Sequence, residues 1–227
     1  MKLAALFSGG KDSTMALYRA LENYDVPVLL SMISERDDSY MYHTSNINLV
    51  SYSADAIGIP VVRRKTSGVP PEENSDLRDA VLTLKNDYGI EGVVVGAVHS
   101  NYQYNGVSEI CRELDLEVYA PYWQHSHEEL IRDAINAGFK IIFISVSAEC
   151  LDETWLGREL NYETLDELMK LEGKSGIDIG GEGGDYETIV LDAPIFKKRV
   201  EILEKDVKWD GVRGEWIIRK VRLVDKN

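Results

Sequence analysis

The stretch Leu6-Phe7-Ser8-Gly9-Gly10-Lys11-Asp12-Ser13 decides the fold of this chain. It ends an apolar run, residues 3–7, whose length and composition are typical of a buried parallel strand. After the two glycines a helical pattern begins at Asp12 or Ser13. A strand, a glycine turn and a helix N-terminus together form an anion site, because backbone N–H groups point outward and the helix dipole favours negative charge.

Three interpretations of this loop compete. A Walker A loop requires glycine at position 5 and Ser or Thr at position 12, where the chain has Ala5 and Asp12. A purely structural turn explains the glycines but not the neighbouring Lys11 and Ser13. The third interpretation is a resemblance: Ser-Gly-Gly-x-Asp-Ser directly after the first strand resembles the pyrophosphate loop (PP-loop) of the N-type ATP pyrophosphatases. Those enzymes cleave ATP to AMP and pyrophosphate.

Strand and helix patterns continue to alternate as far as residue 120. Strands are predicted over residues 26–33, 60–63, 91–96 and 117–120, and helices over residues 48–57, 75–88 and 107–114. Connections of helical length require a parallel sheet covered on both faces, and ligands of such sheets bind beyond the carboxyl ends of the strands. The loops after residues 7, 33 and 95 are therefore expected to converge on one crevice.

Pro121-Tyr122-Trp123 marks a predicted boundary between two domains, residues 1–122 and 123–227. The second is expected to be a smaller α+β domain. Residues 126–129 form a capping box that opens a helix, residues 139–146 are a predicted strand, and Asn161 is expected to cap a helix through residue 171. Two strand-like runs around Asp210-Gly211 predict a terminal hairpin.

Composition disfavours several functions. The net charge of −14 argues against nonspecific nucleic-acid binding, and the longest apolar run, residues 141–144, is too short to span a bilayer. Cys111 and Cys150 form no CxxC and no disulfide framework. Because the first strand starts at the N-terminus, no signal peptide is expected, and we expect a cytoplasmic protein that does not bind membranes.

The charge is unevenly distributed. From residue 196 onward there are ten Lys or Arg against six Asp or Glu, which gives +4 there and −18 before it. A solvated hairpin face is the expected explanation, with a docking surface for an acidic partner as the alternative. His125 and His127 lie at a predicted helix start, where a surface turn is expected in preference to a zinc site.

A second unusual stretch is Glu182-Gly183-Gly184-Asp185-Tyr186-Glu187. Three carboxylates within six residues repel one another, and the adjacent glycines weaken any helix or strand. A metal ion, a cationic substrate or simple exposure to solvent would each accommodate this arrangement. Because EF-hand spacing is absent, a dedicated calcium loop is not expected.

The combination of Ser-Gly-Gly-Lys-Asp-Ser with a distal Glu-Gly-Gly-Asp-x-Glu resembles the diphthine–ammonia ligase family. That family uses ATP and ammonium to amidate diphthine, a modified histidine of translation elongation factor 2, and so completes diphthamide. Further matching segments follow in the same order, at residues 41–44, 96–103, 111–116, 121–123 and 155–158. The resemblance implies a PP-loop (HUP-like, Rossmann-like) nucleotide-binding domain followed by a smaller C-terminal domain, in a minimal archaeal-type form.

The resemblance implies an ATP site with Mg²⁺. The expected ATP-binding residues are Ser8, Gly9, Gly10, Lys11, Asp12, Ser13, Met32, Gly96 and Ala97. Backbone N–H groups and the two serine hydroxyls would hold the β,γ-phosphates, while Met32 and the segment at Gly96 and Ala97 would frame the adenosine. Lys11 would offset the charge on the leaving pyrophosphate, and Asp12 would hold Mg²⁺ directly or through water.

The remaining roles concern the substrate. The expected catalytic residues are Lys11, Asp12, Glu182, Asp185 and Glu187. The acidic motif is expected to bind a second metal, ammonium or the trimethylammonio group of diphthine, and the part of the chain that carries it is expected to close over ATP. By the same resemblance His43, Tyr102 and Tyr186 are expected to contact substrate.

The chain departs from the family pattern at three positions. Tyr104 and Gly106 stand where the family often has arginines, so any contact made by those arginines must come from elsewhere. Asp185 stands where glutamate is commoner, and its shorter side chain has a different reach.

Two other classes of function stay open beside the ligase. A PP-loop enzyme that modifies transfer RNA by thiolation would usually need a catalytic cysteine or a CxxC cluster, and neither Cys111 nor Cys150 fits that spacing. A non-catalytic ATP-binding sensor has no need of Lys11, Asp12 and the acidic motif together. We therefore favour the ligase.

Overall fold

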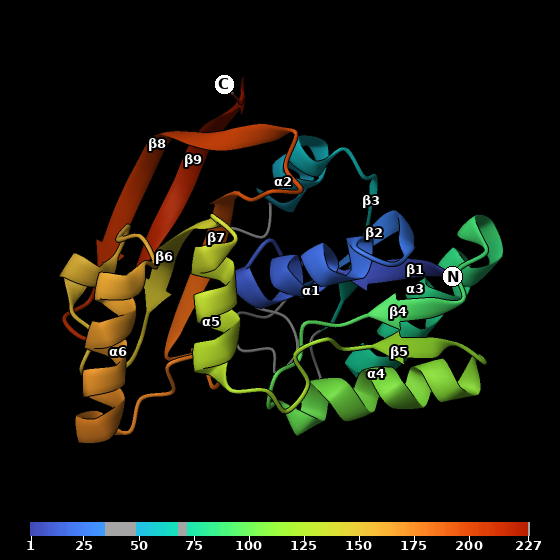
Figure 1. Ribbon diagram of the computed structural model, residues 1–227, viewed down its shortest axis with the longest axis horizontal. Helices are drawn as coiled ribbons and strands as arrows, with labels where there is room; N and C mark the ends of the chain where they lie inside the picture. The colour runs from blue at the N-terminus through green and yellow to red at the C-terminus, as the bar shows by residue number, and fades with distance from the viewer. Residues whose placement is uncertain (35–48, 68–71, 227) are drawn as a thin grey trace. The chain divides into compact units, whose positions relative to one another are not determined.

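The computed structural model describes residues 1–34, 49–67 and 72–226. The chain divides into two compact units, Met1–Gln124 and His125–Asn227 (Figure 1). Within the described residues, no helix combines the length and the hydropathy needed to cross a membrane.

The first unit is built on a five-stranded parallel sheet, which confirms the predicted α/β class. Its spatial strand order is β3-β2-β1-β4-β5. The strands are β1 (Lys2–Leu6), β2 (Asp25–Ser34), β3 (Val61–Thr66), β4 (Gly92–Val94) and β5 (Glu117–Tyr119). The helices between them are α1 (Lys11–Leu21), α2 (Val50–Ile57), α3 (Glu72–Tyr88) and α4 (Asn101–Glu113).

Strand β1 is buried on both of its faces. Ala4 belongs to a core cluster that also contains Leu77 of α3 and Ile110 of α4. Its neighbours Leu3 and Ala5 are fully buried outside that cluster, because successive side chains of a strand point to opposite faces of the sheet. This double burial is why the start of the chain is a continuous apolar run.

The strand order reverses at β1. The chain passes from β1 outward to β2 and β3, and β4 then returns to the other side of β1, where Leu3 pairs with Gly92 and Ala5 with Val94. Ligands of open α/β sheets bind at such a switch point. The loops that follow β1 and β4 therefore leave adjacent strand ends.

Helix α4 begins six residues earlier than its predicted start at residue 107. Its N-cap, Ser100, accepts a hydrogen bond from the backbone N–H of Gln103. Residues 101–106 have no apolar periodicity, so the helical pattern was recognisable only from Val107, the first buried residue of the helix.

The second unit is an antiparallel sheet with helices, with strand order β7-β6-β9-β8. The strands are β6 (Lys140–Val146), β7 (Tyr186–Asp192), β8 (Lys198–Trp209) and β9 (Gly214–Asp225). The helices are α5 (His127–Asn136), the short 3₁₀ helix η2 (Glu153–Trp155) and α6 (Tyr162–Ser175). These elements confirm a C-terminal domain that mixes helices with an antiparallel sheet.

Local signals set the starts of these helices as predicted, whereas α6 continues to Ser175, beyond its predicted end at residue 171. Ser126 caps α5 by accepting from the N–H of Glu129, and Asn161 caps α6 in a reciprocal box with Thr164. The terminal hairpin turns at residues 210–213, where Asp210 Oδ1 accepts from the N–H groups of Val212 and Arg213. A carboxylate that accepts two backbone donors in this way stabilises the turn.

The basic residues of the hairpin lie opposite its own acidic residues. Arg222 pairs with Glu201 at 2.6 Å and Arg219 with Asp206 at 2.7 Å, in both cases across the β8–β9 ladder. These side chains are exposed, so each pair contributes little stability. The arrangement favours a solvated hairpin over a docking surface for an acidic partner.

Candidate functional site

The phosphate loop connects β1 to α1 through two glycines with different backbone conformations. Gly9 has a φ of +83°, in the left-handed region that favours glycine. Gly10 is the N-cap of α1, in an extended conformation and with no side-chain cap. The first-turn N–H groups of an α-helix have no acceptor within the helix itself, and anion sites at helix N-termini use these donors.

Two serine hydroxyls close the loop on itself. The Oγ atoms of Ser8 and Ser13 lie 3.1 Å apart, and the N–H of Ser8 donates to Ser13 Oγ at 3.3 Å. Ser13 Oγ in turn donates to the carbonyl of Gly10 at 3.2 Å. These bonds hold both hydroxyls beside the N-terminus of α1, where a phosphate would accept from them.

Lys11 and Asp12 form a largely buried pair at the same helix start. Lys11 Nζ lies 2.9 Å from Asp12 Oδ2, and the lysine side chain is 4% exposed. Asp12 Oδ1 is buried and has no hydrogen-bond partner among residues 1–34, 49–67 and 72–226. A buried carboxylate oxygen without a donor suits a hard cation, and Mg²⁺ bound with nucleotide needs only one or two protein carboxylates.

The loop after β4 lies directly against the phosphate loop. A Cβ atom added at Gly96 would lie 2.8 Å from both the carbonyl carbon of Asp12 and the N atom of Ser13. Glycine is therefore required at this position for the two loops to touch. Ala97 follows and is buried. The structure thus brings Gly96 and Ala97 together with the predicted phosphate-binding residues.

Met32 lies near the carboxyl end of β2, the neighbour of β1. Leu30 pairs with Leu6, and the N–H of Phe7 donates to the Leu30 carbonyl at 2.9 Å, so Met32 is two residues further toward the carboxyl edge. Its side chain is buried. This edge is the one from which the phosphate loop leaves, as the prediction for the adenosine site requires.

Tyr102 is held by a buried carboxylate. Its hydroxyl donates to Oε1 of Glu73 at 2.7 Å, while its side chain remains 40% exposed. Glu73, on α3, is fully buried. Burial, together with the bond to Glu73 and its charge, raises the pKa of Tyr102 to about 12. The exposed ring is thus fixed in direction, and its contact with substrate stays a prediction.

Tyr104 and Gly106, which stand where the resembled family often has arginines, are both packed against neighbouring side chains. The ring of Tyr104 stacks on Trp123 with centroids 4.0 Å apart. A Cβ atom at Gly106 would lie 3.2 Å from Oδ1 of Asn74, so a long side chain there would have to displace Asn74. The predicted substrate residue His43 lies outside the described residues.

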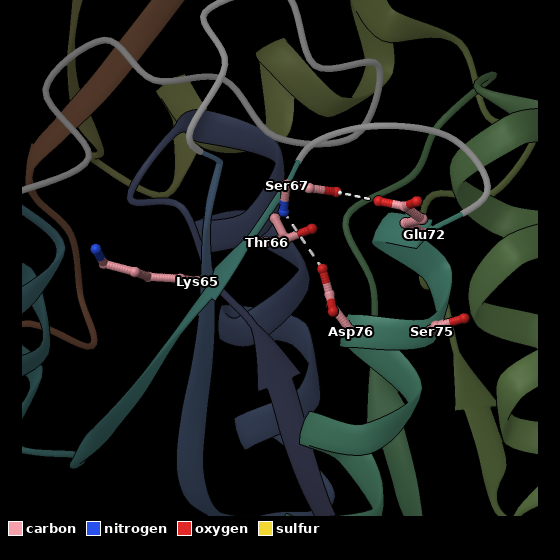
Figure 2. A pocket seen from close by; sticks show the side chains of 6 residues that line it. All are labelled: Lys65, Thr66, Ser67, Glu72, Ser75 and Asp76. Atoms are coloured by element: carbon pink, nitrogen blue, oxygen red, sulfur yellow. Dashed lines mark hydrogen bonds between the residues drawn. The ribbon is translucent and has the colours of Figure 1, made fainter.

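A pocket of about 420 Å³ lies at the carboxyl end of β3, as Figure 2 shows. Ser67 forms two hydrogen bonds to α3: its N–H donates to Asp76 and its hydroxyl donates to Glu72. The lining residues are Lys65, Thr66, Ser67, Glu72, Ser75 and Asp76. None of them was predicted, because nothing in their spacing distinguishes them from an ordinary helix start.

The acidic motif belongs to the second unit, where it spans the end of the loop between α6 and β7 and the first two residues of β7. Asp185 Oδ2 accepts from the N–H of Asp178 at 2.9 Å, and its carbonyl accepts from the N–H of Ser147 at 2.9 Å. Gly183 and Gly184 have φ values of +87° and +88°, which glycine adopts readily. Asp185 therefore stabilises the loop, and its predicted catalytic role would rest on its other oxygen.

Tyr186 lies in the core of the second sheet and is 3% exposed. Its hydroxyl donates to the carbonyl of Ile179, and its ring packs edge-on against Phe143. This placement favours support of the loop over contact with substrate, which stays a prediction. Glu187 is the next residue of β7, so its side chain points to the opposite face, where it is half-buried.

His127 is buried, which corrects the expectation that both histidines lie on a surface turn. His125 is exposed, with Nδ1 3.1 Å from Glu129 Oε2, whereas the His127 side chain is 6% exposed. His127 Nε2 lies 3.6 Å from Asp178 Oδ1 and 3.9 Å from Glu182 Oε2. Among the described residues, no group of three or more His, Cys, Asp or Glu side chains forms a metal cluster.

The burial of His127 had a signal in the sequence. The buried residues of α5 are His127, Leu130, Ile131 and Ala134. They follow the i, i+3, i+4, i+7 spacing of a helix face that packs on a core, and the histidine occupies the first position of that series.

Two family models match the chain. One, described as the diphthamide synthase N-terminal domain, matches residues 1–118, and the other, the diphthamide synthase C-terminal domain, matches residues 126–224. A diphthine–ammonia ligase of Mus musculus is 35% identical over 222 residues, covering 89% of this chain and 83% of the relative. That of Homo sapiens is 33% identical over 227 residues, covering 91% and 85%.

A longer relative and a solved structure are also similar. The diphthine–ammonia ligase of Schizosaccharomyces pombe is 33% identical over 244 residues, which cover all of this chain and 40% of the relative. A predicted subunit of tRNA methyltransferase from Methanocaldococcus jannaschii aligns over 86% of this chain and 98% of its own, with a TM-score of 0.44 and 15% identity. That structure is too distant to bear on function.

Proposed function

Because the chain belongs to the diphthamide synthase family, we propose that it is a diphthine–ammonia ligase that amidates diphthine with ammonium at the expense of ATP. The product is diphthamide, and the protein substrate is translation elongation factor 2. The observation that carries this proposal is the match of both domain models, which together span residues 1–118 and 126–224.

The chemistry requires activation of a carboxylate, which has no leaving group that ammonia can displace. An oxygen of the diphthine carboxylate attacks the α-phosphorus of ATP, an O–P bond forms, and the bond to the β-phosphate oxygen breaks to release pyrophosphate. Ammonia then attacks the carbonyl carbon of the acyl-adenylate, AMP leaves, and the nitrogen loses a proton. In such transfers the protein mainly positions the reactants and stabilises charge.

The first unit supplies the residues for the ATP step. We assign the N–H groups at the start of α1, with the Ser8 and Ser13 hydroxyls, to the β- and γ-phosphates. Lys11 provides a buried positive charge for the leaving pyrophosphate. Asp12, through its buried Oδ1, which has no hydrogen-bond partner in the described part of the chain, is the residue that would hold Mg²⁺; the metal, when bound, would neutralise phosphate charge.

The second unit supplies negative charge for a cation. Glu182 and Glu187 flank the loop that Asp185 stabilises. Ammonium and the trimethylammonio group of diphthine are both cationic, so a pair of carboxylates attracts either of them. We assign the acidic motif to the cationic substrate side of the reaction and the phosphate loop to ATP.

The test is nucleotide product analysis with the complete chain. The protein is incubated with Mg-ATP and ¹⁵N-ammonium, with and without elongation factor 2 from a strain arrested at diphthine. The ligase predicts AMP and pyrophosphate only with that factor, and one ¹⁵N amide in place of its carboxylate. Release of AMP with transfer RNA instead, or ATP binding without any cleavage, would overturn the proposal.

A further inference from the structure

Ser147, the first residue after β6, holds the backbone of the acidic motif by two hydrogen bonds. Its N–H donates to the carbonyl of Asp185 at 2.9 Å, and its hydroxyl donates to the carbonyl of Gly184. The N–H of Ala148 also donates to the Asp185 carbonyl, at 3.3 Å. Two successive carbonyls of the motif thus accept from two successive residues that follow β6.

The backbone part of this contact continues the ladder between β6 and β7. Within the ladder, Ser145 pairs with Glu187 and Val146 with Tyr186, so the same antiparallel register places residue 147 opposite residue 185. Any residue at position 147 that has an N–H can make this bond. The bond to the Gly184 carbonyl is different, because it requires a hydroxyl on the side chain of residue 147.

The segment that Ser147 holds contains two consecutive glycines. Gly183 and Gly184 have φ values of +87° and +88°. Glycine has more accessible backbone conformations than any other residue, so a pair of glycines adopts a single conformation only where other contacts select it. The contacts here are the two bonds from Ser147 and the bond from the Gly184 N–H to the carbonyl of Gly181, at 3.3 Å.

The peptide between Gly184 and Asp185 lies between the two glutamates of the motif. Glu187 belongs to β7, where the ladder fixes its backbone opposite Ser145. Glu182 precedes the two glycines, and its side chain is 25% exposed. The course of the backbone from Glu182 to Glu187 therefore depends on the peptide that the Ser147 hydroxyl holds.

We infer that Ser147 is a positioning residue for the acidic motif: its hydroxyl fixes the peptide between Gly184 and Asp185, and so the spacing of the two glutamates that meet the cationic substrate. This inference rests on the proposed ligase function. It requires that loss of the hydroxyl weaken the use of ammonium or of the diphthine-bearing factor. The affinity for ATP should not change, because the phosphate loop belongs to the other compact unit.

The experiment compares Ser147→Ala, which removes only the hydroxyl, with Ser147→Thr, which keeps it. The matched control is Thr164→Val, which removes a hydroxyl that donates to the carbonyl of Glu159 at 3.0 Å in the same unit. Values of kcat and KM are measured for ammonium and for the diphthine-bearing factor, and the Kd of Mg-ATP is measured by calorimetry. We expect Ser147→Ala to raise one of the two KM values roughly threefold to tenfold, the size of one lost hydrogen bond, and to leave the Kd unchanged.

Thermal unfolding separates positioning from a loss of folded protein. Thr164→Val should lower the unfolding temperature and leave both KM values unchanged. Ser147→Ala should raise one KM value at the same folded fraction as the wild type, and Ser147→Thr should recover at least part of that change, since its hydroxyl can donate to the same carbonyl.

A second variant changes the same peptide from the other side. Gly184→Ala adds a methyl group that meets nothing within 4 Å, so its effect comes from the φ of +88°, which alanine disfavours. We expect the same KM value to rise. Its control is Gly211→Ala in the hairpin turn, where φ is +107° and nothing lies within 4 Å either. If Ser147→Ala does not fold, Ser147→Thr and the two glycine variants carry the test.

Three results would overturn the inference while the ligase function stands. They are unchanged KM values in the folded Ser147→Ala and Gly184→Ala proteins, a threonine variant no better than the alanine variant, and an equal rise of KM in the controls. A wild-type protein that releases no AMP with the diphthine-bearing factor would overturn the proposed function itself. The two failures are thus read from different samples.

Discussion

At the scale of single residues, the proposed ATP site has two adjacent charged side chains, Lys11 and Asp12. Lys11 is almost fully buried, and its Nζ lies 2.9 Å from the carboxylate of Asp12. A buried charge requires such pairing, because leaving water costs several kcal/mol per ion. The pair thus holds a cation for the phosphates and a carboxylate oxygen for a metal at the same helix start.

Replacing Lys11 tests the role of its charge. Lys11→Met keeps most of the buried volume but removes the charge that offsets the leaving pyrophosphate, so kcat should fall about 100-fold or more. The rate of AMP release measures this effect, and urea unfolding serves as the control for stability. Near wild-type turnover in the methionine variant would contradict the assignment.

The Tyr102 hydroxyl makes stability depend on alkaline pH. Its pKa is raised from 10.0 to about 12 in the folded chain, so the folded state holds this proton more tightly than the unfolded state. The contribution is therefore complete below pH 10 and is lost as the pH rises from 10 through about 12. Urea unfolding at several pH values should show a smaller loss over this window in Tyr102→Phe; equal losses in both proteins would contradict the shift.

At the scale of elements, the loops that follow β1 and β4 pack against each other. Their strands are parallel neighbours, and Gly96 allows the second loop to rest on the first turn of α1. In the second unit, the two glycines of the acidic motif, Gly183 and Gly184, and the preceding Gly181 have positive φ, which glycine adopts readily. Function is thus placed on turns that rigid strands hold in position.

Gly96→Ala tests the contact between these loops. The added methyl group would lie 2.8 Å from backbone atoms of Asp12 and Ser13, so the loops must separate. We expect a loss of about 1–3 kcal/mol in the free energy of unfolding and weaker ATP binding by calorimetry. The control is Gly173→Ala, within α6, where nothing lies within 4 Å and alanine favours the helix. Equal behaviour of the two variants would refute this account.

At the scale of the whole molecule, the residues proposed to bind ATP and those proposed to bind the cationic substrate belong to different compact units. The phosphate loop lies within Met1–Gln124 and the acidic motif within His125–Asn227. ATP binding is therefore expected to be a property of the first unit, and it can be tested in the complete chain. A ligand that binds only the folded state stabilises that state by mass action.

Mg-ATP should raise the unfolding midpoint. At a concentration about 100 times its Kd it adds about 2.7 kcal/mol, equivalent to a shift on the order of 5 °C for a chain of this size. Chelating the metal should reduce the shift, and Asp12→Asn should make it insensitive to metal. An equal shift with and without metal in the wild type would contradict a metal site at Asp12.

Much of this protein was determined by local sequence. The apolar run before Gly9 and the alternation of strand and helix patterns specify a parallel sheet, because a strand buried on both faces must be apolar throughout. Caps at Ser126 and Asn161 are equally local, since a capping side chain bonds to a backbone group three residues away. The phosphate loop is readable for the same reason: glycines, lysine and helix start are contiguous.

Tertiary structure decided the rest, because it depends on residues that are distant in sequence. The buried ring of His127 lies against Gly180, Asp178 and Glu182, which are about fifty residues away in the sequence. The burial of Glu73 beneath Tyr102 and the contact between Gly96 and Asp12 likewise join separate elements. Sequence spacing reports neighbours along a helix or strand, whereas packing between elements decides which polar side chains are buried and what they face.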